Sequence, residues 1–306
     1  GKTNNMENKL ALNDNLSLSR IIHGYWRLRD WNLSDQELLK LIEQVLELGI
    51  TSFDHADIYG NYTCEAYFGR ALALKPSLRD QMELISKCGI RLNTDANPEL
   101  DVKIYDYSFN YIVQQAEASL KHLGTDRLDL LLLHRPAPFF NPEEVAKAFD
   151  KLKQSGKVLN FGVSNFTPMQ FDSLQSHLDM PLATNQVEIS VSCLEHFENE
   201  NMEFLQKHKI KPMAWSPLAG GGLFKPQSDK EHRLHSVLKE IAAALNVESI
   251  DQVMYAWLLK HPAGIMPIVG SQHINRIKST VDALEVEMSL EQWYKIYIAS
   301  KGDELP

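Results

Sequence analysis

The sequence predicts an α/β fold, a (β/α)8 TIM barrel with extra helices. Three observations indicate this fold. Short apolar runs alternate with helical patterns from end to end, which is typical of β/α units around a parallel sheet. The chain has 306 residues, of which 44% are hydrophobic, and a barrel of this size forms one domain. Polar residues follow the apolar runs, as expected where the loops of a barrel meet.

Eight apolar runs are the expected strands, and the first of them has the weakest pattern. They cover residues 21–25, 50–53, 82–86, 128–133, 158–163, 182–187, 212–215 and 265–269. Eight alternations of this kind close into a barrel.

Helices are expected between these runs. Ser34 and Glu37 form a capping box that opens a helix ending at Gly49. An Asn-Pro or Thr-Pro pair opens two further helices, over residues 141–156 and from residue 167. The other helical patterns cover residues 108–123, 199–208, 234–245, 250–260, 274–284 and 290–299. These are more than eight helices, so at least one is an insertion.

No composition shift, low-complexity stretch or repeat divides the chain. We therefore expect a single domain over residues 1–306, with poor order over residues 1–18.

The composition excludes several classes of function. A formal net charge of −9 argues against binding to nucleic acid or to an anionic membrane, since both need a basic surface. The three cysteines, Cys64, Cys88 and Cys193, are too far apart for a disulfide frame or a zinc site, so we expect no metal.

The sequence also bears on location and partners. Apolar runs such as residues 130–133 are too short to cross a bilayer, and the N-terminal segment lacks the apolar core of a signal peptide. We expect a cytoplasmic protein whose partner is a small molecule, with a monomer as the default state.

Asp54, Tyr59, Lys87 and His134 form the candidate catalytic group. A free tyrosine has a pKa of about 10, too high for efficient acid catalysis near neutral pH. The Lys87 ammonium would lower this pKa, and Asp54 would pair with Lys87 and hold it. A neutral His134 would donate a hydrogen bond to the substrate oxygen. The group therefore suits delivery of a proton to a carbonyl oxygen as hydride reaches the carbonyl carbon.

Each of these residues also has a structural alternative. Asp54 can cap or pair, and Tyr59 can belong to a surface loop before Gly60. Lys87 can be solvated at a strand end, and His134 can cap a strand. Their position at the ends of successive strands favours the catalytic interpretation, because perturbed titratable groups cluster in active sites.

These residues lie in segments that resemble the aldo-keto reductase family. The segments are FDHADIYGN, LISKCG, SLKHLGTDRLDLLLLHRP, GKVLNFGVSNF, NQVEIS, AWSPLAGG and PIVGS followed by Arg276. Four short stretches are most similar to the family's bacterial YdhF-like branch of oxidoreductases. They are HADIYG, ISKCGI, HRPAP and ATNQVEIS. The resemblance implies an NADPH-dependent reductase of aldehydes or ketones, with Asp54, Tyr59, Lys87 and His134 as its catalytic tetrad.

The cofactor site rests largely on this resemblance. The sequence has no G-x-G-x-x-G and no P-loop motif, but glycines 220–222 follow the seventh run, where a barrel can receive phosphate on backbone N–H groups. The resemblance implies that NADPH contacts the following residues: Gly24, Tyr25, Ser164, Asn165, Gln186, Trp215, Ser216, Pro217, Leu218, Gly220, Gly270, Ser271 and Arg276.

Within this set, Ser164, Asn165 and Gln186 are implied to bind the carboxamide, Trp215 to stack on the nicotinamide, and Arg276 to bind the 2′-phosphate. A core position is the alternative for Trp215. Two departures from the family's pattern weaken the preference for NADPH. Gly270 stands where some relatives have lysine, and serine and threonine at 279–280 replace glutamate and asparagine.

The substrate pocket is expected to be lined by Trp26, His55, Ile58 and Arg135, with Tyr25 beside them. An aromatic wall suits an apolar or aromatic carbonyl compound, and Arg135 can pair with a carboxylate or phosphate. Core positions for Tyr25 and Trp26, and a salt-bridged Arg135, are the alternatives.

Two other classes of function stay open. One is a nucleotide-binding regulatory protein, similar to the potassium-channel β-subunits. Such a protein would keep the fold and sense redox state with little turnover. A glycosidase would use two carboxylates such as Asp54 and Glu188, which leaves Lys87, Tyr59 and Asn165 without a role. Oxidation of NADPH by carbonyl compounds separates both alternatives from a reductase.

Overall fold

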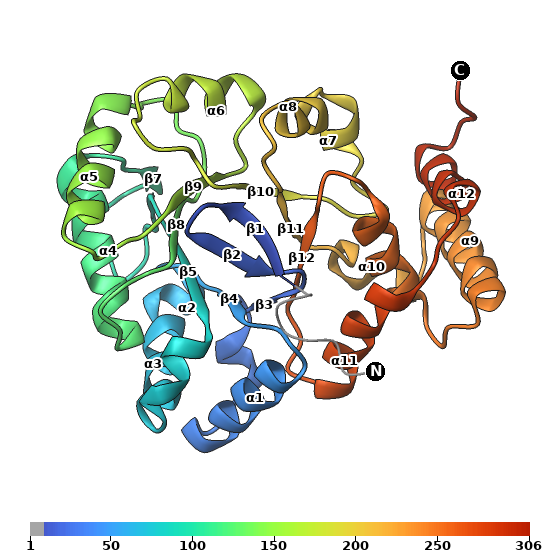
Figure 1. The fold of residues 1–306 in the computed structure, drawn as a ribbon, viewed down its shortest axis with the longest axis horizontal. Coiled ribbons are helices and arrows are strands. Elements are labelled where there is room, and N and C mark those ends of the chain that lie inside the picture. Colours follow the sequence, from blue (N-terminus) through green and yellow to red (C-terminus); the bar gives the residue numbers. More distant parts are fainter. Residues whose placement is uncertain (1–8) are drawn as a thin grey trace. The chain divides into compact units, whose positions relative to one another are not determined.

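The computed structural model describes residues 9–306. Its eight parallel strands form a closed barrel in the order β10-β11-β12-β3-β4-β5-β8-β9 (Figure 1), which confirms the predicted fold class. The strands are β3 (Ile22–Gly24), β4 (Ser52–Asp54), β5 (Glu83–Cys88), β8 (Leu130–Leu133), β9 (Phe161–Ser164), β10 (Asn185–Glu188), β11 (Met213–Trp215) and β12 (Met266–Val269).

Every strand of the barrel overlaps one predicted apolar run. All eight strands begin later than their runs do, and Leu128 and Val158, for example, form only an isolated parallel bridge ahead of β8 and β9. All four leucines of β8 are fully buried, as expected for a parallel strand covered on both faces.

The chain divides into two compact units. The first contains the described residues up to Asn185 together with Gly270–Gln272, and the second contains Gln186–Val269 and His273–Pro306. The single domain expected from the sequence stays a prediction.

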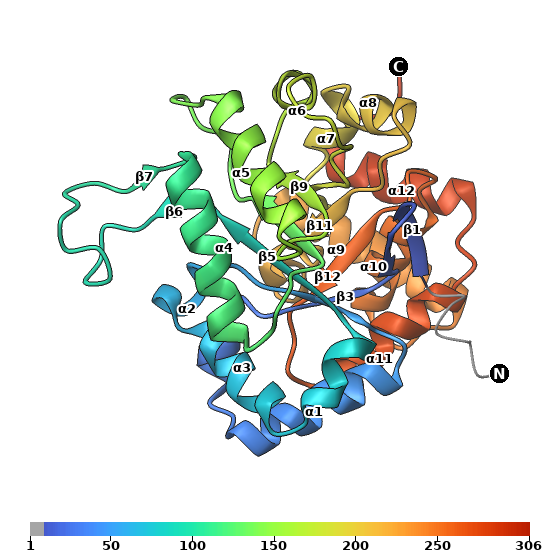
Figure 2. The same ribbon diagram turned by 60° about the vertical axis from the view of Figure 1, so that its left-hand side comes forward.

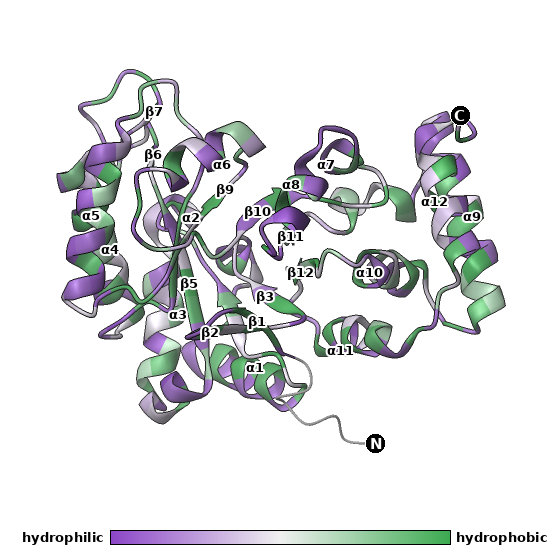
Figure 3. Cartoon of the chain, turned by 45° about the horizontal axis from the view of Figure 1, so that its top comes forward, coloured by the Kyte–Doolittle hydropathy of each residue, from purple (hydrophilic) through white to green (hydrophobic). Residues whose placement is uncertain are grey.

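Helices α1, α4, α5 and α6 of the first unit follow their predicted signals, whereas the short α2 and the longer α3 were not predicted. The Ser34 and Glu37 capping box is present at the start of α1, and α5 buries every third or fourth residue, which gives the alternating colours along this helix in Figure 3. The elements are η1 (Leu28–Trp31), α1 (Asp35–Glu47), α2 (Tyr59–Tyr62), α3 (Cys64–Ala73), η2 (Pro76–Gln81), α4 (Phe109–Leu123), α5 (Pro142–Gln154) and α6 (Pro168–Gln175).

Helix α3 is the longer of the two missed helices, since no helix is predicted over its residues. Its sequence contains Gly69, which weakens a helical pattern. A Cβ at this position would come within 2.0 Å of the carbonyl oxygen of His122. Glycine is therefore needed for the close packing of α3 against α4.

Two hairpins were also not predicted. The first pairs β1 (Lys9–Asn13) with β2 (Leu16–Ser19), so residues 9–18 are ordered where poor order was expected, and residues 1–8 lie outside the described residues. The second pairs β6 (Ile90–Arg91) with β7 (Ile104–Tyr105), and Figure 2 shows its long loop extending from the strands of the first unit.

The second unit contains the C-terminal helices, and its predicted helices are all present. Helix α9 begins earlier than expected, because Ser228 and Glu231 form a capping box. The indoles of Trp257 and Trp293 stack at 4.6 Å, and each donates to the other's backbone carbonyl, which fastens α10 to α12. The elements are α7 (Glu195–Glu198), α8 (Asn201–Lys207), η3 (Ala219–Phe224), α9 (Asp229–Leu245), α10 (Ile250–Lys260), α11 (Ile274–Asp282), η4 (Ala283–Glu285) and α12 (Leu290–Lys301).

Helices α9 and α12 lie side by side (Figure 1). Between residues 9 and 306, no helix has both the length and the apolar character needed to cross a membrane.

Candidate active site

Three of the four candidate catalytic residues lie at the C-terminal ends of adjacent strands in the first unit. Asp54 is the last residue of β4, Lys87 is next to last in β5, and His134 follows β8 directly. The pairs β4–β5 and β5–β8 are both parallel, so these ends meet at one edge. The backbone N–H of His134 donates to the carbonyl of Cys88 at 2.9 Å, which extends the ladder to this edge.

Lys87 is the centre of the group. Its Nζ donates to Asp54 Oδ2 at 2.8 Å, to the backbone carbonyl of His55 at 2.9 Å and to Tyr59 Oη at 2.9 Å. An ammonium has three N–H donors, and all three are used. The side chains of Lys87 and Asp54 are only 1% and 3% exposed, so each buried charge depends on the other.

A left-handed turn presents Tyr59 to Lys87. Tyr59 begins α2, and Gly60 follows with φ of 62°. A Cβ at Gly60 would lie 2.6 Å from Cys64 Sγ, so glycine is needed for both conformation and space. The ring of Tyr59 also lies edge-on to that of His134, with centroids 6.2 Å apart. The structure therefore brings all four predicted residues together.

The pKa of Tyr59 differs in direction from the expectation. Burial raises it above its ordinary value, and the attraction of Lys87, which lowers it, does not offset burial. The predicted lowering of the Tyr59 pKa is therefore wrong for the protein without bound ligand. Burial removes water from the phenolate, and this effect exceeds the stabilisation of the phenolate by Lys87. Burial alone would lower the pKa of Lys87, but the attraction of Asp54 and Tyr59 raises it above its ordinary value.

His134 is held neutral. Burial, and then the positive charges of Lys87 and Arg135, place its pKa well below the ordinary value. Its Nδ1 is buried and has no hydrogen-bond partner within residues 9–306. A neutral imidazole carries one N–H donor, which is the state that polarisation of a carbonyl oxygen requires.

Two predicted cofactor residues of the first unit lie beside this group. Ser164 ends β9, and Asn165 follows in the left-handed conformation with φ of 63°, which asparagine adopts more readily than most residues. The Nδ2 of Asn165 donates to the carbonyl of His134 at 3.1 Å and to Ser164 Oγ at 3.2 Å. The side-chain amide is therefore fixed against the candidate catalytic group.

Tyr25 and His55 belong to the core, contrary to their predicted contacts with cofactor and substrate. Both are 0% exposed. Their rings stack at 4.7 Å, Tyr25 Oη is hydrogen-bonded to His23 Nδ1 at 2.8 Å, and Phe68 packs edge-on against both rings. Gly24, the last residue of β3, is buried beside them. The predicted cofactor contact of Tyr25 and the predicted substrate contact of His55 are therefore wrong, because rings enclosed in this way have no surface for a ligand.

The other predicted substrate contacts lie nearer to solvent. Trp26 is 63% exposed, with the guanidinium of Arg27 over its ring, so its core alternative is wrong. Ile58 is half-buried. Arg135 is exposed and forms no ion pair within the described part of the chain. Its backbone N–H donates to Tyr107 Oη at 3.0 Å. Of the predicted aromatic wall, Trp26 is exposed, whereas Tyr25 and His55 are buried.

The second unit contains Gln186 and Trp215. Gln186 is buried in β10, with its Nε2 3.7 Å from Met213 Sδ. Trp215 ends β11 and is half-buried, so its ring is not enclosed in the core.

A left-handed loop follows Trp215 in this unit. Ser216, Ala219, Gly220 and Gly221 all have φ between 50° and 87°, with Pro217 and Leu218 between them. A Cβ at either glycine would meet nothing within 4 Å, so glycine is needed here for conformation and not for space. Turns of this kind expose backbone N–H groups that can receive an anion.

The remaining cofactor candidates follow β12. Gly270 is exposed, and the carbonyl of Ser271 is 2.7 Å from His23 Nε2, both within the first unit. Arg276 lies in the first turn of α11, exposed, and makes no ion pair within residues 9–306. Thr280 is buried and donates to the carbonyl of Arg276 at 3.1 Å.

Glu65 was missed in the sequence. Its carboxylate accepts hydrogen bonds from Ser86 Oγ at 2.7 Å and from Ser119 Oγ at 3.0 Å, and Ser86 is the residue before Lys87. Burial raises the pKa of Glu65 to about 7. A glutamate three residues before the buried Phe68, on the apolar face of a helix, is the signal that could have identified it.

Three comparisons bear on this site. A family model described as Aldo/keto reductase family matches residues 20–301. Oxidoreductase YdhF of Escherichia coli (strain K12) is 49% identical over 288 residues, 94% of this chain and 95% of that protein. A 6-dehydroglucose reductase of Agrobacterium fabrum is 43% identical over 298 residues, 97% of this chain and 99% of that protein.

The fold has solved counterparts as well. The crystal structure of an aldo/keto reductase from Klebsiella pneumoniae, in complex with NADP and acetate, matches with a TM-score of 0.73. The match covers 92% of this chain and 90% of that one at 24% identity, which supports the barrel fold.

Proposed function

The chain belongs to the aldo/keto reductase family, whose members are NAD(P)H-dependent oxidoreductases, and we propose that it reduces an aldehyde or a ketone with NADPH, with Tyr59 as the proton donor. One observation carries the proposal. Lys87 Nζ contacts Asp54 Oδ2 and Tyr59 Oη at 2.8 and 2.9 Å, so a buried ammonium lies against the hydroxyl that must release a proton.

Tyr59 is protonated at neutral pH, since burial raises its pKa. As negative charge develops on the carbonyl oxygen, that oxygen becomes basic enough to take the Tyr59 proton. Lys87 stabilises the phenolate that remains, and Asp54 keeps Lys87 in place.

His134 acts on the carbonyl oxygen before the proton arrives. Its low pKa keeps the imidazole neutral, so that it donates one hydrogen bond and polarises the C=O bond without giving up its proton. When bound, NADPH would supply the hydride to the carbonyl carbon. Transfer of the Tyr59 proton to the carbonyl oxygen then completes the alcohol.

The residues present fit NADPH. The amide of Asn165, fixed beside the catalytic group, can match the nicotinamide carboxamide. The left-handed loop after Trp215 can receive the pyrophosphate. Arg276 is exposed and suits a bidentate contact with the 2′-phosphate. The other proposed contacts are Ser164, Gln186, Gly270 and Ser271.

Arg276→Ala tests the choice of NADPH over NADH. We expect KM for NADPH to rise at least tenfold, because a charge-assisted hydrogen bond contributes about 1.5–3 kcal/mol, while KM for NADH changes little. Lys278→Ala removes an exposed cation of the same helix and should leave both constants unchanged. An unaltered preference for NADPH in Arg276→Ala would remove this role from Arg276.

The proposed substrate is a polar carbonyl compound. Burial of Tyr25 and His55 leaves Trp26 as the one aromatic residue of the predicted wall that a substrate can contact. Trp26, Ile58 and Arg135 stay as proposed contacts. The 43% identity to a 6-dehydroglucose reductase favours oxidised sugars within this class.

Turnover of a carbonyl panel tests the function. NADPH oxidation is followed with aliphatic and aromatic aldehydes, ketones and oxidised sugars, and we expect steady turnover with at least one class. Tight binding of the nucleotide without turnover of any compound would overturn the proposal and favour the regulatory alternative.

We propose that the protein is a cytoplasmic monomer and that its partner is a small molecule. The free thiols of Cys64, Cys88 and Cys193 support a reducing compartment.

A further inference from the structure

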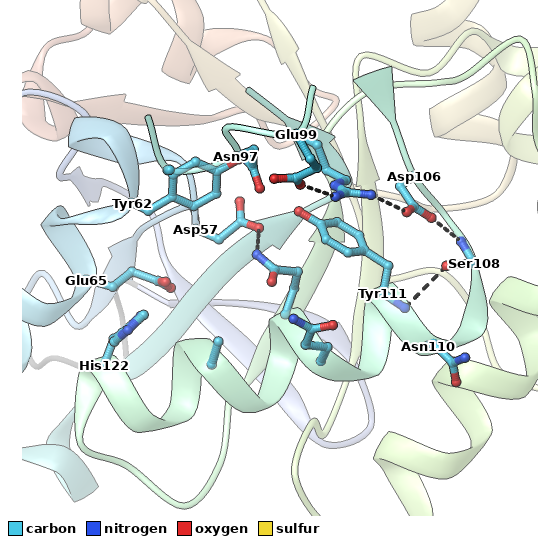
Figure 4. Close-up of a pocket in the computed structure, with 15 residues that line it drawn as sticks. Asp57, Tyr62, Glu65, Asn97, Glu99, Asp106, Ser108, Asn110, Tyr111 and His122 are labelled. Atoms are coloured by element: carbon cyan, nitrogen blue, oxygen red, sulfur yellow. Dashed lines mark hydrogen bonds and ion pairs between the residues drawn. The ribbon is translucent and has the colours of Figure 1, made fainter. Parts of the chain in front are cut away.

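A cavity of about 540 Å³ lies in the first unit, apart from the contacts of the catalytic group. Its walls are α4, the start of α3, and the segment of residues 91–108 that contains the β6–β7 loop (Figure 4). Its volume is within the range of ~300–1,000 Å³ typical of small-molecule pockets.

Asp57 places an unpartnered carboxylate oxygen in this cavity. The residue is 4% exposed. Its Oδ2 accepts a hydrogen bond from Gln115 Nε2 at 2.7 Å, but Oδ1 is buried and has no partner within residues 9–306. Figure 4 shows this oxygen turned away from the dashed contact, toward the space between Tyr62 and Tyr111. A buried acceptor without a partner costs about 1–3 kcal/mol, so a donor on a ligand would be stabilising here.

The carboxyls of the cavity outnumber its cations. Arg91 is the one lysine or arginine among the described residues that line it, and it is ion-paired with both Glu99 at 3.0 Å and Asp106 at 3.3 Å. The other two lining carboxyls, Asp57 and Glu65, accept hydrogen bonds from neutral groups only. When Asp57 is ionised, no ion pair within residues 9–306 balances its charge, so the cavity then favours an additional positive charge beside it.

An organic cation suits these walls better than a metal ion. Within residues 9–306, no three His, Cys, Asp or Glu side chains converge on a point that could hold a metal. The side-chain amides of Asn97, Asn110 and Gln114 line the cavity and can exchange hydrogen bonds with hydroxyl groups. We propose that this cavity binds a protonated primary amine that also carries hydroxyl groups, with the ammonium at Asp57 Oδ1.

Binding of such a cation is linked to pH. Burial raises the pKa of Asp57 to about 8, so its carboxyl is protonated near neutral pH, and an ammonium at Oδ1 favours the ionised form. Binding therefore releases protons and strengthens as the pH rises from about 6 to about 8. Glu65, with a pKa of about 7, contributes to the same release. The groups that face Asp57 are Glu65 of α3, Lys87 and Cys88 of β5, Tyr107, and Tyr111 and Gln115 of α4.

The probe for this site is 3-aminopropane-1,2-diol, and glycerol is its uncharged analogue. Isothermal titration calorimetry on the full chain without nucleotide should detect the amine and not glycerol. We expect Asp57→Asn, which removes the carboxylate, and Ala118→Met, which fills the cavity without changing charge, each to weaken binding at least tenfold.

Two control variants should bind the amine as the wild type does. Asp101→Asn removes an exposed carboxylate of the same loop that does not line the cavity, and Tyr59→Phe changes the catalytic group only. Titrations in two buffers of different ionisation enthalpy should show proton release in the wild type.

Three outcomes would overturn the proposal. They are no detectable binding of the amine, equal binding of amine and glycerol, or undiminished binding of the amine by Ala118→Met. The Ala118→Met result tests the proposal even if Asp57→Asn fails to fold. None of these outcomes depends on reductase activity, so this site and the proposed function fail separately.

Discussion

Asp54 and Asp57 are two aspartates three residues apart whose surroundings differ sharply. Both are almost fully buried, at 2% and 4% exposed. Asp54 forms an ion pair of 2.8 Å with Lys87, whereas Asp57 has a neutral amide on one oxygen and no partner on the other within the described residues. Burial raises the pKa of Asp57 to about 8. Equal burial thus produces a charged pair in one place and a neutral acid in the other, and the cation makes the difference.

The largest effect is expected from Lys87→Met. This variant leaves Asp54 buried without a cation, so the free energy of unfolding at neutral pH should fall by about 3–5 kcal/mol. Lys75→Met is the matched control, because Lys75 pairs with Glu43 at the surface, and its effect should stay below about 1 kcal/mol. Denaturant unfolding measures both. Equal losses in the two variants would show that Asp54 does not depend on Lys87.

Asp57→Asn is expected to raise the free energy of unfolding, by less than Lys87→Met lowers it. The folded state holds the Asp57 proton up to about pH 8, whereas the unfolded state loses it near pH ~4. The folded state therefore binds more protons between these values, and the wild-type free energy of unfolding falls as the pH rises through this window.

Asp57→Asn removes this slope. Between about pH 5 and pH 8 the variant should gain at least about 1.4 kcal/mol relative to the wild type, the equivalent of one pKa unit. Unfolding curves for both proteins across this range measure the difference. Parallel pH profiles would mean that Asp57 is ionised in the folded protein across this range.

Glu65→Gln sharpens the comparison with a third buried carboxyl and should have the smallest effect. Its folded-state pKa of about 7 is raised less, so the pH-dependent gain should end near pH 7. At low pH the variant loses one of the hydrogen bonds from Ser86 or Ser119, which costs about 1 kcal/mol. A larger pH effect than that of Asp57→Asn would reverse the proposed order of the two acids.

Local signals in the sequence were sufficient for much of the fold. Apolar runs identified all eight strands of the barrel, and the capping box at Ser34 identified the start of α1. These local signals failed where tertiary packing determines the local structure. The helix that contains Gly69 was missed, because its glycine is explained only by the nearby carbonyl of His122 in the folded chain.

The candidate site shows the same limit. Position at strand ends brought Asp54, Lys87 and His134 together correctly, because parallel strands share one edge. It did not show that Tyr25 would turn into an aromatic cluster with His55. Nor did it indicate the sign of the Tyr59 pKa shift, since burial is a property of the folded structure.

Single-turnover reduction by Tyr59→Phe tests the central claim most directly. The variant is mixed with NADPH and the carbonyl compound that the wild type turns over best, and Tyr294→Phe, which loses an exposed hydroxyl of α12, is the control. Loss of the proton donor should slow reduction by about 10²–10⁴-fold while NADPH binding and the control stay unchanged. Reduction by Tyr59→Phe at the wild-type rate would contradict the account.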